Sequence, residues 1–159
     1  MPSATQLVTF VGRLRRWGLG GLALAGLSAQ AQFATVPPAQ RPAQVPASLA
    51  LNEKAYRKDA AQHIYAAYPS HILKGMVPPL VYAIMVTETE VDARGAVLQV
   101  RVVRAPAAAK EVTPWVVSLI RRAAPLPPPA RLGRVKFIEV WLVDKSGQFQ
   151  VHTLTEGQQ

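Results

Sequence analysis

The chain contains no cysteine and few charged residues, and each shortage excludes a class of protein. Without cysteine, its 159 residues can form no disulfide, thiol nucleophile, thiolate metal site or acylated lipoprotein anchor. Charged residues make up 17% of the chain and half of it is hydrophobic, so the chain is not disordered as a whole. Histidine is also scarce, and its three residues, His63, His71 and His152, lie eight or more positions apart. That spacing does not predict a zinc site.

Sequence signals for catalysis are absent as well. The serines stand outside any nucleophile-elbow pattern, and no glycine-rich loop resembles a phosphate cradle. Glu88, Glu90 and Asp92 alternate along one predicted strand, and no aspartate-rich loop surrounds them. They indicate a solvated strand face rather than a cation site. We therefore expect a protein that is not an enzyme and that carries no metal or cofactor.

The charge of the chain is moderately positive. After position 31, 15 basic and 9 acidic residues leave a net charge of about +6. The basic residues are scattered without interleaved aromatics or a recognisable motif, so nucleic acid is not an expected partner. The charge fits anionic surfaces such as peptidoglycan. The candidate basic patch consists of Arg121, Arg122, Arg131 and Arg134.

The N-terminal residues have the pattern of an export signal. Residues 11–31 read VGRLRRWGLGGLALAGLSAQA, in which arginines precede an apolar run and the small residues Ala29 and Ala31 flank Gln30. This pattern predicts a signal peptide, residues 1–31, that is cleaved after Ala31 and delivers a periplasmic protein. The alternative is an uncleaved segment that keeps the domain at the inner membrane. The apolar run is shorter than the ~20 residues that span a bilayer.

Prolines separate this segment from the rest of the chain. Residues 35–48 read TVPPAQRPAQVPAS, and repeated prolines favour an extended polyproline conformation. We interpret residues 32–51 as a linker rich in proline, alanine and glutamine, and residues 52–159 as one domain. At ~3.1 Å per residue, the proline-rich stretch could reach on the order of 40 Å.

Periodicity in the domain predicts helices and short strands. Asn52 is a good N-cap for a helix over 53–67. Thr113 as N-cap, followed by Pro114, predicts the start of a second helix that directs Trp115 inward. Runs rich in β-branched residues indicate strands. The predicted strands are 80–91, 96–104, 135–143 and 149–154.

The first two strands are predicted to form a hairpin. Gly95 lies in the turn, where it can take the left-handed conformation that closes a hairpin. Alternation along the strands places Glu88, Glu90 and Arg101 on the face toward water or a partner. The buried face is predicted to consist of Met85, Thr87, Thr89, Val91, Leu98, Val100 and Val102.

Four stretches, in this order and spacing, are similar to the C-terminal domain of TonB, the energy transducer that contacts outer-membrane receptors. They are Tyr68-Pro69, the hairpin VDARGAVLQVRVV, the helix SLIRRAAPLPPP and the strand RVKFIEVWLVD. The resemblance covers roughly residues 65–145. It implies a two-layer α+β fold, with helices packed on one face of a small antiparallel sheet of three to four strands.

The resemblance also implies a binding mode. In that family the last strand can accept an extended receptor peptide by strand addition. Carried over to this chain, the accepting edge strand is 135–143, in which Trp141 would anchor either the helix layer or the incoming peptide. The edge residues that would bind the peptide are Lys136, Phe137, Ile138, Glu139, Val140, Trp141 and Leu142.

Three features depart from a complete energy transducer. The anchor is predicted to be removed, the linker is short, and the predicted strand 149–154 can pair with the accepting edge and cover it. We therefore expect a periplasmic, non-catalytic module that binds an extended segment of an envelope or outer-membrane protein, with a link to TonB-type transport. The alternatives are an inner-membrane-anchored transducer component and a cationic peptidoglycan-associated protein. An exposed edge would also allow a homodimer.

Overall fold

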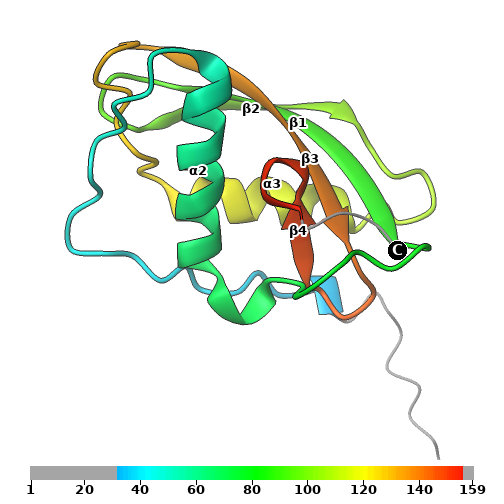
Figure 1. The fold of residues 1–159 in the computed structure, drawn as a ribbon. Helices are drawn as coiled ribbons and strands as arrows, with labels where there is room; N and C mark the ends of the chain where they lie inside the picture. The colour runs from blue at the N-terminus through cyan, green and yellow to red at the C-terminus, as the bar shows by residue number, and fades with distance from the viewer. Residues whose placement is uncertain (1–31, 156–159) are drawn as a thin grey trace, which may run out of the picture.

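The computed structural model describes residues 32–155, which form an α+β fold around a four-stranded antiparallel sheet (Figure 1). The helices that pack on the sheet are α2 (Glu53–Ala67) and α3 (Val112–Ala123). The strands are β1 (Ala83–Val91), β2 (Val97–Arg104), β3 (Val135–Val143) and β4 (Phe149–Val151). The short 3₁₀ turns η1 (Pro69–His71) and η2 (His152–Leu154) follow α2 and β4. The predicted α+β class with a small antiparallel sheet is confirmed.

The strand order in the sheet is β2-β1-β3-β4. β1 and β3 pair along their whole length, from Ala83 opposite Val143 to Val91 opposite Val135. β4 pairs with only the last three residues of β3. Residues of β1 and β3 alternate between a buried face and a more exposed one. Both helices pack against the buried face of the sheet: in the view of Figure 1, α3 lies beneath the strands and α2 stands upright at the left.

Aromatic side chains fill the space between the sheet and the helices. Phe149 of β4 contacts four rings at centroid separations of 5.2 to 6.4 Å, those of Tyr65, Tyr68, Trp115 and Trp141. Such pairs contribute about 0.5–1.5 kcal/mol each beyond the area that they bury. Trp115 is buried, so its predicted inward position on α3 is confirmed.

The two helices begin differently. α2 has the predicted bounds, and Asn52 Oδ1 accepts a hydrogen bond from the backbone N–H of Ala55 at 2.9 Å. α3 begins at Val112, so the prediction that Thr113 is its N-cap is wrong. The chain already turns before that point, because the N–H of Val112 donates to the carbonyl of Ala109 at 3.1 Å.

The β1–β2 hairpin turns at Gly95, which has the predicted left-handed conformation with a φ of +85°. A Cβ atom here would lie 2.0 Å from the carbonyl oxygen of Leu126, so no other residue fits. The N–H of Leu126 in turn donates to the carbonyl of Gly95 at 2.8 Å. This contact holds the hairpin turn against the segment that follows α3.

Two register shifts interrupt the pairing of β1 with β2. At one of them Glu90 lies opposite Gln99 and Val91 lies opposite Val97, which leaves Leu98 as an extra residue. An extra residue in one strand changes the side to which the neighbouring side chains point. Leu98 is 48% exposed, so its predicted place on the buried face is wrong.

Residues 32–51 lie on the domain instead of projecting from it, and we call them the strap. Phe33 is buried, stacks on Tyr82 at 5.8 Å and meets Trp115 edge to face at 5.2 Å. The N–H of Ser48 donates to the carbonyl of Pro128 at 2.9 Å. The strap is largely extended, as its prolines predict, but these contacts remove the reach expected of a free linker.

The predicted signal peptide and its cleavage site at Ala29 and Ala31 lie outside the described residues. Within residues 32–155, no helix has the length and apolar character needed to cross a membrane.

Candidate binding edges of the sheet

β3 is an interior strand, so the prediction that 135–143 is an edge strand along its whole length is wrong. β1 covers one side of β3 throughout, and β4 covers the other side from Trp141 to Val143. The expected pairing of the last strand with this edge is thus present. Residues 135–140 have no strand on that second side within the described part of the chain. We call this stretch the half-edge.

Charged side chains form hydrogen bonds with backbone groups of the half-edge. Arg57 of α2 donates from Nη1 to the carbonyl of Ile138 at 3.2 Å. Glu139 Oε1 accepts from the backbone N–H of Val140 at 3.0 Å and from that of Thr153 at 3.3 Å. These bonds take the place of a neighbouring strand, because buried backbone groups need partners. Some backbone hydrogen-bonding groups of the half-edge therefore have partners without a bound peptide.

Glu139 is a buried acid, with only 3% of its surface exposed. Burial raises the pKa of its carboxyl, while hydrogen bonds from Thr153 and Val140 and the charge of Arg57 oppose that rise. Within the described residues, Glu139 Oε2 and Arg57 Nε make no hydrogen bond. An open cavity of about 360 Å³ beside Arg57, Lys136 and Phe137 adjoins this cluster. Some hydrogen-bonding capacity is thus unused beside the half-edge.

The remaining predicted edge residues divide between two faces. Phe137 and Trp141 point into the core, while Lys136 and Leu142 point to the opposite face of the sheet. Trp141 is 1% exposed and donates from Nε1 to Thr87 Oγ1 at 3.0 Å. Its indole therefore anchors the helix layer, and no incoming peptide can reach it.

The outer side of β4 is also occupied. The N–H of Leu73 donates to the carbonyl of Phe149 at 2.9 Å, and Ile72 forms an isolated parallel bridge with the same residue. The side-chain amide of Gln150 donates to the carbonyls of Leu73 and Gly75 at 2.8 and 2.6 Å. The segment after η1 thus covers this end of the sheet.

β2 is the free edge of the sheet. It stands last in the strand order, and nothing within residues 32–155 pairs with its outer side. None of its eight residues is buried. Arg101, Arg104 and the two register shifts are features that commonly prevent uncontrolled pairing at an edge. β2 therefore replaces β3 as the candidate accepting strand.

The direction of the backbone groups follows from the antiparallel pairing. The carbonyl of Ile138 points away from β1, because it accepts from Arg57. Opposite residues of an antiparallel pair either exchange hydrogen bonds or both point away. Glu88, opposite Ile138, therefore points its backbone groups toward β2. Arg101, opposite Glu88, points its groups back toward β1.

Val100 and Val102 flank Arg101 and therefore direct their N–H and C=O groups away from the sheet. Their side chains are half-buried and hold the strand on the domain. Leu98 and Val103 next to them are 48% and 45% exposed. The edge thus offers outward backbone groups between two exposed aliphatic side chains.

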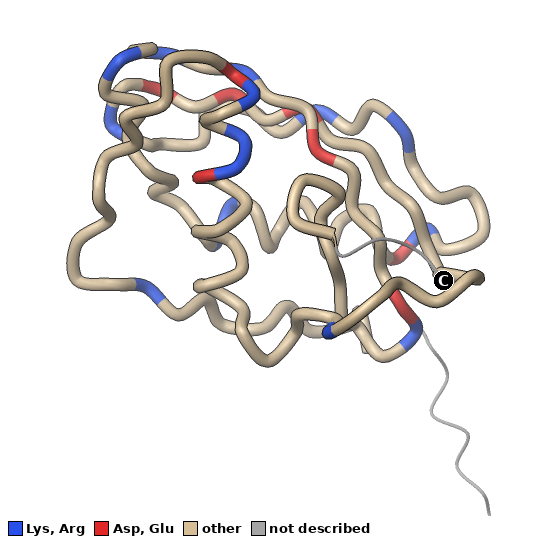
Figure 2. The backbone as a smooth tube through the Cα atoms, viewed as in Figure 1, with Lys and Arg blue, Asp and Glu red and all other residues tan. Residues whose placement is uncertain are grey.

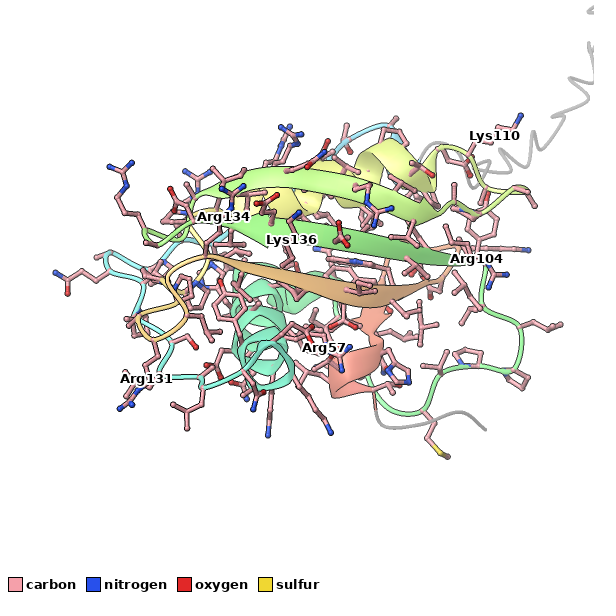
Figure 3. All side chains as sticks on the ribbon, turned by 90° about the horizontal axis from the view of Figure 1, so that it is seen from above. Arg57, Arg104, Lys110, Arg131, Arg134 and Lys136 are labelled. Carbon is pink, nitrogen blue, oxygen red and sulfur yellow. The ribbon has the colours of Figure 1, made fainter. Side chains whose placement is uncertain are left out.

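The four arginines of the predicted basic patch do not form one surface, and Figure 2 shows Lys and Arg spread over the described chain. Arg121 and Arg122 lie in the last turn of α3, where Arg122 donates to the strap carbonyl of Val36 at 2.9 Å. Arg134 forms an ion pair with Glu90. Figure 3 shows Arg131 and Arg134 pointing to different sides of the chain before β3. The prediction of a single patch is therefore wrong.

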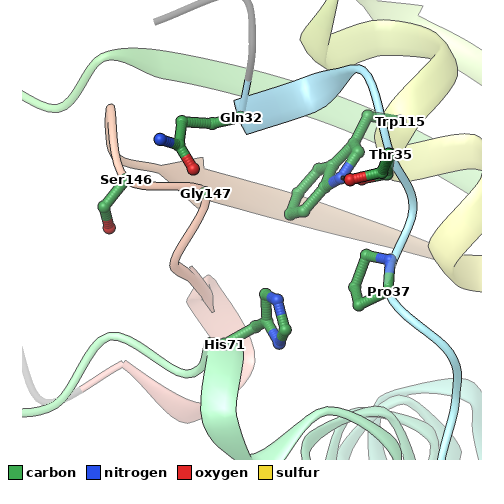
Figure 4. Close-up of a pocket in the computed structure, with 7 residues that line it drawn as sticks. All are labelled: Gln32, Thr35, Pro37, His71, Trp115, Ser146 and Gly147. Carbon is green, nitrogen blue, oxygen red and sulfur yellow. Dashed lines mark hydrogen bonds between the residues drawn. The ribbon is translucent and has the colours of Figure 1, made fainter. Parts of the chain in front are cut away.

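Histidine and serine side chains line a cavity of about 150 Å³ between the strap and the β3–β4 turn (Figure 4). Ser146 Oγ donates to Asp144 Oδ1 at 2.7 Å, and His71 Nδ1 shares a hydrogen bond with Ser70 Oγ at 3.0 Å. These bonds tie Ser146 and His71 to neighbours of their own, not to each other as a nucleophile and its base would be. No group of three potential metal ligands occurs within residues 32–155.

Sequence reasoning missed the caps of the half-edge and the outward groups of β2. Arg57 has the spacing of any exposed helical arginine, so no local pattern reveals that it reaches Ile138. The outward direction of Val100 and Val102 depends on which strand lies beside β2, and strand order is a tertiary property.

Comparison of the chain with protein-family models, curated proteins and solved structures gives no match.

Proposed function

We propose that this chain is a non-catalytic binding module of the cell envelope, and that it adds an extended segment of an envelope or outer-membrane protein as a strand along β2. The observation that carries the proposal is β2 itself, an eight-residue edge strand without a buried side chain. In strand addition, main-chain hydrogen bonds give affinity and alternate side chains give selectivity. The export pattern of residues 1–31 supports the periplasm as the compartment.

The charges on β2 favour a segment that contains carboxylates. Arg101 is paired with Glu88 through two hydrogen bonds of 3.1 and 3.0 Å. Arg104 is exposed and makes no salt bridge within the described residues. An acidic residue of the partner could pair with Arg104, while an apolar one could pack on Val103. Receptor segments of TonB-type transport are one class of partner for this mode.

The strap favours a free module over an anchored transducer. A transducer needs a long connection to the inner membrane, and the contacts of Phe33 and Ser48 bind residues 32–51 to the domain. Intact mass separates the two. A species that lacks residues 1–31 in periplasmic fluid fits the module, whereas a full-length species confined to membranes fits the transducer.

Proline substitution at one outward N–H tests the edge. A photo-crosslinking residue at Leu98, which is exposed on β2, would record partner capture in the cells that produce the protein. Val102→Pro removes an outward donor without removing a β1–β2 hydrogen bond. We expect the crosslinked product to fall by about tenfold. A loss of about 1.4 kcal/mol with the missing main-chain hydrogen bond corresponds to a factor of ten in binding.

Val102→Ala is the matched control, because it shortens the same side chain but keeps the N–H. We expect it to retain most of the crosslinked product, and circular dichroism should show both variants folded. An equal loss in the alanine and proline variants would assign the effect to the side chain. It would rule out strand addition along β2.

A further inference from the structure

The face of the sheet opposite the helices is half apolar. Near the hairpin turn its outward residues are polar, as expected for the solvated face of an antiparallel sheet. Toward the other end they become aliphatic, with Ile84 opposite Leu142 and Val86 opposite Val140. We call this surface the aliphatic patch. It consists of Ile84, Val86, Val103, Ile138, Val140 and Leu142.

β2 contributes to the patch through its second register shift. Val86 lies opposite Arg104 and Thr87 lies opposite Val102, so Val103 is an extra residue that turns toward the open face. Val103 is 45% exposed, Ile138 44% and Ile84 37%. Figure 3 looks onto this face, with α3 behind the sheet and α2 seen nearly end-on beside β3. No described helix or strand covers the patch.

Most of the charged groups exposed around the patch are positive, although Glu53 of α2 lines the cavity next to Lys136 and Ile138. The side chain of Arg101 is 53% exposed, whereas that of its partner Glu88 is 24% exposed. Arg134 and Lys136 are 66% and 58% exposed above Glu90, which is 7% exposed. The carboxylates therefore lie beneath the cations that pair with them. Arg104 adds a cation at the other end, opposite Val86.

We propose that the aliphatic patch binds an amphipathic helix of a partner protein, with carboxylates on the flanks of its apolar stripe. The patch is three strands wide, or about 10 Å, which matches the width of one helix. Its length of four to five strand residues, roughly 13 Å, matches about nine residues of helix. Apolar helix residues at i, i+3, i+4 and i+7 would contact the patch, and the flanking carboxylates would meet Arg104 and Lys136.

Charge and shape argue against two other occupants. A second copy of this chain would bring the same cations together across the contact, which opposes association. A membrane surface is disfavoured because the aliphatic side chains lie between charged ones on a sheet, not at a protruding tip. An acidic helix satisfies both the apolar and the charged parts.

A designed peptide tests the proposal independently of strand addition. The probe is a fluorescein-labelled helical peptide of about 15 residues, with leucines at i, i+3, i+4 and i+7 and glutamates on both flanks. We expect saturable binding to the full chain by fluorescence anisotropy. Val103→Glu should weaken it by about tenfold, because it places a carboxylate in the patch. Leu98→Glu, an equally exposed leucine on the same strand but outside the patch, should leave the affinity within about twofold.

Methyl NMR locates the bound peptide. Shifts confined to the methyl groups of the aliphatic patch, among them Ile84, Ile138 and Val103, would support the proposal. Equal binding of a peptide with scrambled leucines, equal losses in the two glutamate variants, or no binding would overturn it. So would association of the chain with itself that Val103→Glu abolishes, or binding to phosphatidylglycerol vesicles in place of the peptide.

Discussion

Glu139 shows how one residue can combine structural support with an energetic cost. Its Oε1 satisfies the N–H groups of Val140 and Thr153, which would otherwise lie unpaired where β4 ends. Its Oε2 makes no hydrogen bond within the described residues. A buried carboxylate with one unsatisfied oxygen is costly in its charged form. The backbone contacts require an oxygen at this position but not a negative charge.

The pH dependence of stability should therefore differ between the wild type and Glu139→Gln. Burial raises the pKa of Glu139 in the folded state above the value of about 4.3 in an unfolded chain. Between these two values the folded state holds a proton that the unfolded state has lost, so the free energy of unfolding falls as pH rises. Lowering the pH from 7 to 4.5 should stabilise the wild type relative to Glu139→Gln. The two urea-unfolding curves measure this difference, and parallel pH profiles would contradict it.

The strap shows that an extended element can be part of the core. Its repeated prolines favour an extended conformation with few internal hydrogen bonds, so its position depends on contacts with the domain. Phe33 supplies the largest apolar contact, and Trp115 Nε1 donates to the carbonyl of Thr35 at 3.2 Å. Arg41 adds two hydrogen bonds to the carbonyl of Arg122, at 3.2 and 2.9 Å.

Phe33→Ala should release the strap. Removal of a buried phenylalanine costs about 3 kcal/mol where the site cannot refill, and Phe33 supplies the largest apolar contact between the strap and the domain. We expect thermolysin to cleave within residues 34–48 much faster in this variant, while the rest of the domain stays resistant. Gln44→Ala, an exposed change in the same segment, is the control. Equal cleavage of both variants would show that the strap does not depend on Phe33.

Some element bounds were predictable because they follow local patterns, whereas the partners of the elements were not. The helix from Glu53 and the strand 135–143 have the bounds that capping and alternation predict. The predicted burial of Leu98 was wrong because a register shift follows from pairing across two strands, which alternation within one strand does not encode. The prediction of the accepting edge was wrong for a related reason. Whether a strand is interior or at an edge depends on strand order, and β4 takes the position beside β3.

At the scale of the whole molecule, backbone pairing is closed on one side and open on the other. Ile72 and Leu73 cover β4, and side chains cap the half-edge, whereas within residues 32–155 β2 is protected only by charge and irregular pairing. Unpaired strands tend to pair with any available strand, including one from a second copy. The single bond from Arg57 to Ile138 is therefore placed where it can limit self-association.

Arg57→Ala should increase self-association through the half-edge. The substitution frees the carbonyl of Ile138, and a strand from a second copy can then supply the missing donor. A net hydrogen bond contributes about 1 kcal/mol, so we expect the dimer dissociation constant to fall by roughly fivefold. Sedimentation equilibrium measures this constant, with Lys58→Ala as the control because Lys58 is an exposed neighbour on the same helix. Matching dissociation constants for the two variants, with both folded, would show that Arg57 does not protect this stretch of β3.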